Sequence, residues 1–464
     1  MTTDPSADDL SRAELRRQRR SVITEGAPRE GVDVIRPVEL AVVVSVQPPG
    51  MTDADVAASL DELEALLDTA GARVVERVVQ RRDTPEPATF IGRGKVDELR
   101  QLAGRHGADA VVFDDDLSPA QQRNLEEGIG QKVLDRTIVI LDIFAQHATS
   151  REGKAQVELA QLTYLLPRLR GWGTALSRQA GGRAAGGVGI GGRGPGETQL
   201  EVDRRRLNRR ITALRRDLAR FEQTRHTKAA ERERTPLQHV ALVGYTNAGK
   251  SSLLNRLTGA EALVQDRLFA TLDPTVRRLA LPDGRTVALS DTVGFVRKLP
   301  HGLVEAFKST LEESTRAGLL LHVVDASHPE ATAQVDAVHE VLREIDAADR
   351  PSLLVLNKVD VANPAAVRAL ARLRDPDPDS ADVATVSAVT GEGCDQLLAR
   401  IAQRLPDPRV RVQALVPWER SDLVAQAHEH GDVHTSKHLD NGTLIDATVP
   451  ALTARALAEY PADA

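Results

Sequence analysis

The feature that most constrains the fold of this chain is the segment G-Y-T-N-A-G-K-S at 244–251. An apolar run at 240–243 precedes it, and the apolar pattern of a helix follows at 253–257. In such a strand–turn–helix unit, glycines let backbone N–H groups turn inward, and the helix directs its positive end at the same point. This context predicts a phosphate-binding loop on an α/β domain with a doubly wound, mostly parallel sheet.

Three shorter motifs follow the loop in order. Asp291 begins D-T-V-G, Asn357 begins N-K-V-D, and Ser387 begins the pair S-A. One such match can arise by chance, but four in this order and at these spacings predict a site for a guanine nucleotide with Mg²⁺. Hydrolysis of a phosphate ester is then the expected chemistry.

The phosphate side of the predicted site depends on four residues. Lys250 is expected to reach the β- and γ-phosphates, and the Ser251 hydroxyl is expected to ligate Mg²⁺. Asp291 is expected to hold the Mg²⁺ through a water molecule. Gly294 leaves its backbone N–H free to bond the γ-phosphate, so this residue can sense hydrolysis.

The base side of the site predicts the choice of purine. Asp360 can accept hydrogen bonds from N1–H and the 2-amino group of guanine. Adenine offers no donors there and would leave a desolvated carboxylate, which costs about a few kcal/mol. We expect Asn357 and Lys358 to support the base, and Ser387-Ala388 to present a backbone N–H to the guanine O6.

The group that orients the attacking water is not evident from the sequence. Many GTPases place glutamine directly after D-x-x-G, but here that position is Phe295, which predicts slow intrinsic hydrolysis. Asn247 suggests help from a monovalent cation such as K⁺, as in loops of the form G-x-x-N-x-G-K-S. A nucleotide switch also needs a threonine that closes over Mg²⁺, and Thr271 and Thr275 both qualify on chemistry.

Composition excludes several other classes of protein. The chain has no apolar run near 18 residues and no apolar signal core at its N-terminus, so no membrane span is expected. The single cysteine, Cys394, excludes an intramolecular disulfide and suits a reducing compartment. We therefore expect a cytoplasmic protein, with peripheral membrane contact left open, and the sequence demands no more than a monomer.

Apolar patterning divides the chain into five segments. Strand and helix patterns alternate in the part before residue 150 and again after residue 407, which predicts a sheet with packed helices in each. In the first of these, Ser118-Pro119 is expected to open a helix. The predicted segments are a disordered extension (1–37), an N-terminal α/β domain (38–150), a helical hairpin (151–236), the nucleotide domain (237–406) and a C-terminal α/β domain (407–464).

The hairpin is predicted from two sets of apolar residues that repeat at spacings of four and three. These are Ala155, Leu159, Leu162, Leu166 and Leu169 in the first arm, and Leu207, Ile211, Leu214, Leu218 and Phe221 in the second. The loop between them, 171–196, holds eleven glycines. It contains G-x-G-x-x-G at 187–192, but no strand precedes that pattern, so we do not expect dinucleotide binding.

Charge marks the same segment as a candidate for RNA binding. The chain has a net charge of −7, yet residues 151–240 contain 19 Lys+Arg against 9 Asp+Glu. Because phosphate contacts dominate RNA binding, this asymmetry predicts that the hairpin meets a polyanion. A solvated helix face is the alternative for its arginines. The candidate RNA-binding residues are Arg178, Arg183, Arg193, Arg204 and Arg205.

Taken together, these motifs resemble the HflX family of ribosome-associated GTPases over residues 38–464. The resemblance lies in G-Y-T-N-A-G-K-S, F-A-T-L-D-P-T at 269–275, D-T-V-G-F at 291–295, N-K-V-D, F-I-G-R-G-K at 90–95 and G-P-G-E-T-Q-L at 194–200. It implies that Thr271 is the switch threonine that binds Mg²⁺. It also implies a hairpin that enters the large ribosomal subunit and contacts ribosomal RNA near the peptidyl-transferase centre, in a protein that splits or rescues stalled or stressed ribosomes.

The complete predicted site combines the motifs and this resemblance. Ser251, Thr271 and Asp291 are the predicted metal ligands, and Lys250, Thr271 and Gly294 are the predicted catalytic residues. The predicted GTP contacts are Gly244, Tyr245, Thr246, Asn247, Ala248, Gly249, Lys250, Ser251, Phe269, Ala270, Thr271, Leu272, Asp273, Asp291, Thr292, Val293, Gly294, Asn357, Lys358, Val359, Asp360, Ser387, Ala388 and Val389.

Two other functions remain open at this point. An assembly GTPase would act on precursor large subunits without splitting ribosomes. An RNA-binding module with slow, regulatory nucleotide turnover would bind RNA equally well with GDP and with a GTP analogue. An ATP-driven RNA remodeller is disfavoured by Asp360.

Overall fold

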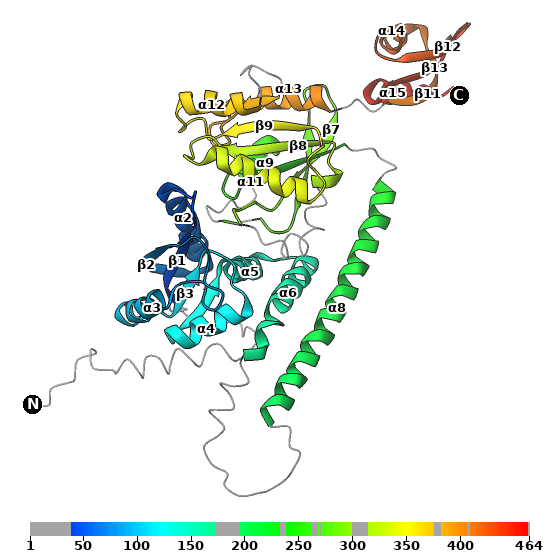
Figure 1. Ribbon diagram of the computed structural model, residues 1–464. Helices are drawn as coiled ribbons and strands as arrows, with labels where there is room; N and C mark the ends of the chain where they lie inside the picture. Colours follow the sequence, from blue (N-terminus) through cyan, green and yellow to red (C-terminus); the bar gives the residue numbers. More distant parts are fainter. Residues whose placement is uncertain are drawn as a thin grey trace, which may run out of the picture.

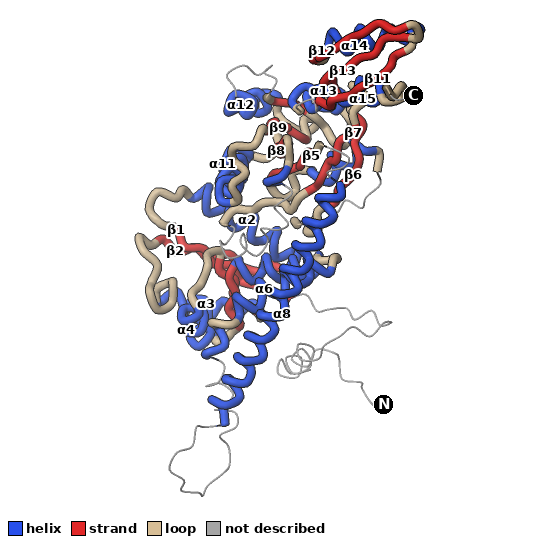
Figure 2. The backbone as a smooth tube through the Cα atoms, turned by 90° about the vertical axis from the view of Figure 1, so that its right-hand side faces the viewer, coloured by secondary structure: helices blue, strands red, loops and turns tan. Residues whose placement is uncertain are grey.

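The structure is a computed structural model of the chain. It describes residues 39–171, 195–232, 238–260, 268–269, 271–298, 314–374, 382–405 and 409–462. Three sheets with their helices are arranged one after another, and the long helix α8 (Pro195–Arg232) runs beside the first of them and reaches the side of the second (Figure 1). Figure 2 shows the same order from a second side, with α8 next to α6 (Arg151–Leu165). In the part that the structure describes, no helix is both long and apolar enough to cross a membrane.

The N-terminal domain is a parallel four-stranded sheet with helices on both faces. Its strand order is β2-β1-β3-β4. Alternate residues of β1 enter two separate cores, with Val43 packed on one face and Val42 and Val44 on the other. The elements are β1 (Glu39–Gln47), α2 (Asp53–Ala70), β2 (Ala72–Arg81), α3 (Arg93–His106), β3 (Ala110–Phe113), α4 (Pro119–Ile129), β4 (Lys132–Asp135) and α5 (Arg136–His147).

The predicted start of α4 is confirmed in its local chemistry. Ser118 is the N-cap and accepts a hydrogen bond from the backbone N–H of Gln121, whose side chain in turn accepts from the backbone N–H of Ser118. Pro119 occupies the first helical position, where its missing N–H costs nothing. Residues 1–37, predicted to be disordered, lie outside the described residues.

The helical hairpin forms, but its first arm is shorter than predicted. Helix α6 ends at Leu165, and a short 3₁₀ turn, η1 (Arg168–Gly171), follows. Leu166 is the C-cap of α6, with helical backbone and its N–H bonded to the carbonyl oxygen of Leu162, and Leu169 lies beyond the helix. Pro167 has no N–H to continue the hydrogen-bond ladder, so the helix ends here. The residues α6 buries are Gly153, Gln156, Val157 and Ala160, whereas the predicted Ala155, Leu159 and Leu162 are half-buried.

The second arm follows its prediction more closely. In α8, Ile211 and Leu214 are buried, while Leu207, Leu218 and Phe221 are half-buried. The helix packs against α6, which itself packs on α5 of the N-terminal domain. Most of the glycine-rich loop, 172–194, lies outside the described residues.

The central domain has the predicted doubly wound sheet. Its strand order is β10-β9-β8-β5-β7-β6, and every pair is parallel except β6–β7. The carboxyl ends of β5, β7 and β9 meet along one edge, where ligands bind in sheets of this kind. The elements are β5 (His239–Gly244), α9 (Lys250–Thr258), β6 (Thr275–Ala280), β7 (Thr286–Asp291), β8 (Leu319–Asp325), α11 (Ala331–Glu344), β9 (Ser352–Asn357), α12 (Pro364–Arg374), β10 (Val383–Thr385) and α13 (Cys394–Arg404).

The C-terminal domain is an antiparallel sheet of order β11-β13-β12 covered by helices. Gly442 begins β13 at φ 154°, and a Cβ there would lie 2.3 Å from the carbonyl oxygen of Val416, so the residue must be glycine. The elements are β11 (Arg409–Val416), η2 (Trp418–Arg420), α14 (Ser421–His430), β12 (Asp432–Leu439), β13 (Gly442–Pro450) and α15 (Ala451–Leu457).

Candidate functional site

The predicted phosphate loop connects β5 to α9 as the sequence requires. Gly249 is the N-cap of α9 at φ 90°, and a Cβ on it would lie 2.3 Å from Nδ2 of Asn357. A Cβ on Gly244 would lie 2.2 Å from the carbonyl oxygen of Val323. Both positions therefore require glycine, because a side chain would push the loop off the sheet edge.

Lys250 lies buried under the loop. Its Nζ donates to the carbonyl oxygens of Gly244 at 3.1 Å and Tyr245 at 2.8 Å. Burial lowers the pKa of Lys250 to about 8, against the opposing attraction of Asp291. A phosphate group beside Nζ would favour the charged form, so this cation is placed to bind an anion.

Three side-chain oxygens meet at the end of β7. Ser251 Oγ lies 2.5 Å from Asp291 Oδ2 and 2.9 Å from Thr271 Oγ1, and Thr271 Oγ1 lies 2.9 Å from the same carboxylate oxygen. The other oxygen, Asp291 Oδ1, is buried and has no hydrogen-bond partner among the described residues. Mg²⁺ prefers oxygen ligands, and a buried carboxylate oxygen without a hydrogen-bond partner is a natural place for a cation. These three side chains therefore fit a magnesium site. Thr275 instead begins β6, in register with Asp291.

The backbone after Asp291 is held on the phosphate loop. Thr246 N–H donates to the carbonyl oxygen of Phe295 at 2.8 Å, and Phe295 N–H donates to that of Gly244 at 3.1 Å. A Cβ on Gly294 would lie 2.8 Å from Cα of Thr246 and 3.0 Å from Nζ of Lys250. Phe295 itself is buried, so its ring packs in the core beneath the loop.

Asn357 joins the phosphate loop to the S-A motif. Its Nδ2 donates to the carbonyl oxygen of Ala248 at 2.9 Å, and its Oδ1 accepts from the backbone N–H of Ala388 at 3.0 Å. The N–H predicted to meet guanine O6 is therefore bonded to Asn357 in this structure. Arg256, which sequence reasoning missed, holds the same loop by donating to the carbonyl oxygens of Ala388 and Val389.

The rest of the N-K-V-D motif lies at the surface. Lys358 adopts φ 62° and its Nζ forms an ion pair with Asp325 at 2.6 Å. Asp360 is exposed, and Val359 beside it is half-exposed. The Asp360 carboxylate is thus accessible to a base at this edge of the sheet.

Several predicted nucleotide contacts direct their side chains elsewhere. Phe269 and Leu272 are buried in the core shared with the N-terminal domain, where the Phe269 ring meets Phe144 edge-on at 4.7 Å. Val293 is buried in the same core. Thr292 Oγ1 donates to the carbonyl oxygen of Leu242 at 2.6 Å. These four residues can therefore contact a nucleotide through their backbone, not through their side chains. Asn247 adopts φ 58° in the phosphate loop, and Ala270 lies outside the described residues.

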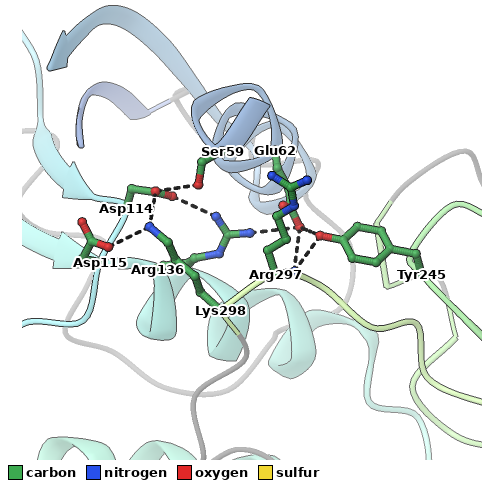
Figure 3. Close-up of polar contacts among 8 residues, drawn as sticks. All are labelled: Ser59, Glu62, Asp114, Asp115, Arg136, Tyr245, Arg297 and Lys298. Atoms are coloured by element: carbon green, nitrogen blue, oxygen red, sulfur yellow. Dashed lines mark hydrogen bonds and ion pairs between the residues drawn. The ribbon is translucent and has the colours of Figure 1, made fainter. Parts of the chain in front are cut away.

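A buried polar cluster, which sequence reasoning also missed, joins the site to the N-terminal domain (Figure 3). The Tyr245 hydroxyl donates to Glu62 at 2.6 Å and accepts from the backbone N–H of Arg297 at 2.6 Å. Arg136 forms ion pairs with Glu62 at 2.9 Å and with Asp114 at 2.8 Å.

Lys298 completes this cluster from the segment that follows Gly294. Its Nζ lies 2.7 Å from Asp114 and 2.7 Å from Asp115. Burial lowers the pKa of Lys298, but Asp114 and Asp115 outweigh that effect and raise it overall. Asp114 and Asp115 lie at the carboxyl end of β3, the edge at which open parallel sheets usually bind ligands. In this protein the Lys298 side chain, from the central domain, occupies that position.

The RNA-binding candidates within the described residues lie on α8. Arg204 and Arg205 are exposed, and Arg205 forms an ion pair with Glu201 at 2.5 Å one turn away. An exposed pair of this kind contributes roughly 0–1 kcal/mol, so it yields readily to a stronger anion. Arg178, Arg183 and Arg193 lie outside the described residues.

The doubly wound sheet and its phosphate loop place this protein among the P-loop GTPases, and the family model described as "50S ribosome-binding GTPase" matches residues 239–358. Three further family models match other parts of the chain: "GTP-binding GTPase N-terminal" (57–145), "GTP-binding GTPase Middle Region" (147–232) and "HflX C-terminal domain" (375–459). The chain belongs to the HflX family of GTPases.

Relatives match along most of their length. A protein of Akkermansia muciniphila named GTPase HflX is 45% identical over 429 residues, which cover 92% of this chain and 98% of the relative. GTPase HflX of Escherichia coli (strain K12) is 47% identical over 347 residues, covering 75% and 79%. Among solved structures, a GTP-binding protein from the archaeon Sulfolobus solfataricus in complex with GDP is 24% identical with a TM-score of 0.41, covering 79% of this chain and 99% of that chain.

Proposed function

We propose that this GTPase binds the large ribosomal subunit and uses GTP binding and hydrolysis to dissociate or rescue stalled or stressed ribosomes. The observation that carries the proposal is the combination, in one chain, of a GTPase domain with a long helix of exposed arginines that packs on the N-terminal half of the molecule through α6. The family model for the central domain, described as a 50S ribosome-binding GTPase, supports the choice of partner. The arginine guanidinium can donate two parallel hydrogen bonds to one phosphate, and phosphate contacts dominate the affinity of proteins for nucleic acids.

Each domain has one task in this proposal. The N-terminal domain (38–150) supports the hairpin (151–236), which binds ribosomal RNA through Arg204 and Arg205 and through its loop. The GTPase domain (237–406) binds GTP or GDP, and the C-terminal domain (407–464) is an appended α/β unit. The protein acts as a monomer in the cytoplasm.

The proposed site holds Mg²⁺ through Ser251, Thr271 and, by way of water, Asp291. When bound, the cation neutralises charge on the β- and γ-phosphates. Lys250 contacts the same phosphates from beneath the loop. Gly294 donates its backbone N–H to the γ-phosphate, and its lack of a side chain allows the close approach to Lys250.

Asp360 selects guanine in this proposal. It is exposed beside the loop that Asn357 and Arg256 position, so a base can reach its carboxylate. A site built around donor groups of the ligand rejects a purine that lacks them by orders of magnitude.

We further propose that K⁺ assists hydrolysis, because Phe295 is buried and cannot orient water. Asn247 lies in the phosphate loop at φ 58°, where its short polar side chain tolerates left-handed backbone. GTP turnover should be faster in K⁺ than in Na⁺ at equal ionic strength. Equal rates in the two salts would remove the cation from the account.

The test of the proposed function is sedimentation of intact ribosomes after incubation with the protein and GTP. We expect free subunits to grow at the expense of intact ribosomes, and we expect no growth with Lys250→Ala. No growth of free subunits would contradict splitting, and growth that does not require GTP would contradict the proposed use of GTP. RNA affinity that is equal with GDP and with a GTP analogue would favour the RNA-binding module, and action on precursor large subunits alone would favour the assembly GTPase.

A further inference from the structure

The segment that carries Thr271 is bonded directly to the root of the hairpin. Asp273, two residues later, accepts four hydrogen bonds through its carboxylate from residues more than 120 positions away. The donors are the backbone N–H of Thr149 at 3.0 Å and of Ser150 at 2.7 Å, and their hydroxyls at 2.6 Å and 2.5 Å. Ser150 is the N-cap of α6, so this carboxylate caps the first arm of the hairpin from outside.

The fit of this contact is tight enough to exclude a side chain on the helix. Gly153 lies in the first turn of α6, and a Cβ there would lie 2.5 Å from Asp273 Oδ1 and 3.0 Å from Ser150 Oγ. The contact is therefore specific in shape.

The residues on both sides of Thr271 contact the N-terminal half of the chain, and we call these two contacts anchors. On one side, the Phe269 ring packs edge-on against Phe144 of α5. On the other side, Asp273 holds the start of α6. The Thr271 hydroxyl between these anchors is bonded to Ser251 and Asp291 at the nucleotide site. A displacement of Thr271 must therefore strain or break one of the two anchors.

We propose that Asp273 is a positioning residue for GTP hydrolysis, which holds Thr271 at the nucleotide site by fixing this segment to the start of α6. The same bonds couple the start of the hairpin to the nucleotide site. A coupling free energy between two sites acts equally in both directions, so each site stabilises the other. A hairpin held by a partner stabilises Thr271 in place, and a nucleotide that holds Thr271 stabilises the start of α6. The partner side of this coupling depends on the proposed function, whereas the link itself does not.

Three variants of the full-length protein separate this role from a general loss of structure. Asp273→Ala removes the acceptor, and Gly153→Ala leaves Asp273 intact but displaces its carboxylate. Gly104→Ala is the matched control, since it is an exposed helical glycine with nothing within 4 Å of an added Cβ. Affinity for GDP, measured in each variant, reports whether the nucleotide site is still folded.

Two readouts without ribosomes test the proposal. We expect kcat for GTP to fall at least about tenfold in Asp273→Ala and in Gly153→Ala, with KM for GTP changed less than about threefold, as for an interaction that matters mainly in the transition state. We expect amide hydrogen exchange of residues 149–154 to be slower with a non-hydrolysable GTP analogue than with GDP in the wild type and in Gly104→Ala. That difference should vanish in the two test variants.

The proposal is overturned if either test variant retains kcat within about twofold of the wild type. It is also overturned if GDP affinity falls as much as turnover, or if exchange at 149–154 is the same in both nucleotide states of the wild type. Failure of ribosome splitting in the sedimentation experiment would contradict the proposed function and leave these outcomes unaffected.

Discussion

Replacing Arg136 by methionine should destabilise the N-terminal domain far more than a surface change. The side chain is 1% exposed and lies between two carboxylates, Glu62 at 12% and Asp114 at 0% exposure. Asp114 also bonds Ser59 at 2.7 Å and Lys298 at 2.7 Å. Removing one partner of a buried ion pair costs about 3–5 kcal/mol, because the remaining charge stays buried. Since Lys298 still faces Asp114 in the variant, we expect the lower end, about 3 kcal/mol.

The assay is urea unfolding of the full-length protein in saturating GDP, followed by amide hydrogen exchange of β1 and β3, because residues 38–150 contain no tryptophan or tyrosine whose fluorescence could report this domain. Bound GDP stabilises the GTPase domain and so separates its unfolding from that of the N-terminal domain. The double variant Arg136→Met/Asp114→Asn should recover at least about 1 kcal/mol relative to the sum of the single changes, because a neutral amide needs no counter-charge. A loss below about 1 kcal/mol in Arg136→Met would show that the cluster is solvated and would refute the reasoning.

Three further predictions concern the nucleotide site and the hairpin. Lys250→Ala should weaken GTP binding by at least about a hundredfold in a fluorescence titration, because its Nζ is the buried cation beneath the loop; normal affinity would refute its assigned role. Asp360→Asn should shift the preference from guanine toward xanthine nucleotides in competition binding, and an unchanged preference would undermine its assignment to the base. Deleting 174–194 should leave GTP affinity intact and weaken binding to large subunits in co-sedimentation; unchanged subunit binding would make the loop a spacer.

The central domain could be predicted closely because its constraints are local. The phosphate loop is a short motif with a strand before it and a helix after it. Its glycines are required by close neighbours, as Gly244 is by the carbonyl oxygen of Val323. The strands around it are continuous apolar runs, which are typical of a parallel sheet covered on both faces. The choice between Thr271 and Thr275 could not be made from chemistry, and it was the family resemblance that favoured Thr271.

The contacts between domains could not be predicted, because they join residues far apart in the sequence. Asp273 was predicted as a nucleotide contact from its motif, yet its carboxylate binds Thr149 and Ser150. The Tyr245 hydroxyl likewise binds Glu62, 183 residues away. One signal was available: three aspartates, 114–116, follow a buried strand, and the carboxyl end of a parallel sheet is where ligands are held.

The first arm of the hairpin shows the limit of periodicity. Leucines at spacings of four and three continue past Leu165, but Pro167 ends the helix regardless of them. The face that α6 buries is also set by small residues, Gly153 and Ala160, that allow close packing on neighbouring elements. Apolar spacing alone gives little weight to such residues.

The measurement that tests the central claim most directly is steady-state GTP turnover with and without purified large ribosomal subunits. Because Phe295 replaces the usual water-orienting glutamine and is buried, we expect slow turnover alone and a rise of at least about a hundredfold with large subunits. ATP should be hydrolysed at background rates in both conditions. Turnover that is unchanged by large subunits, or that accepts ATP as readily as GTP, would contradict the account.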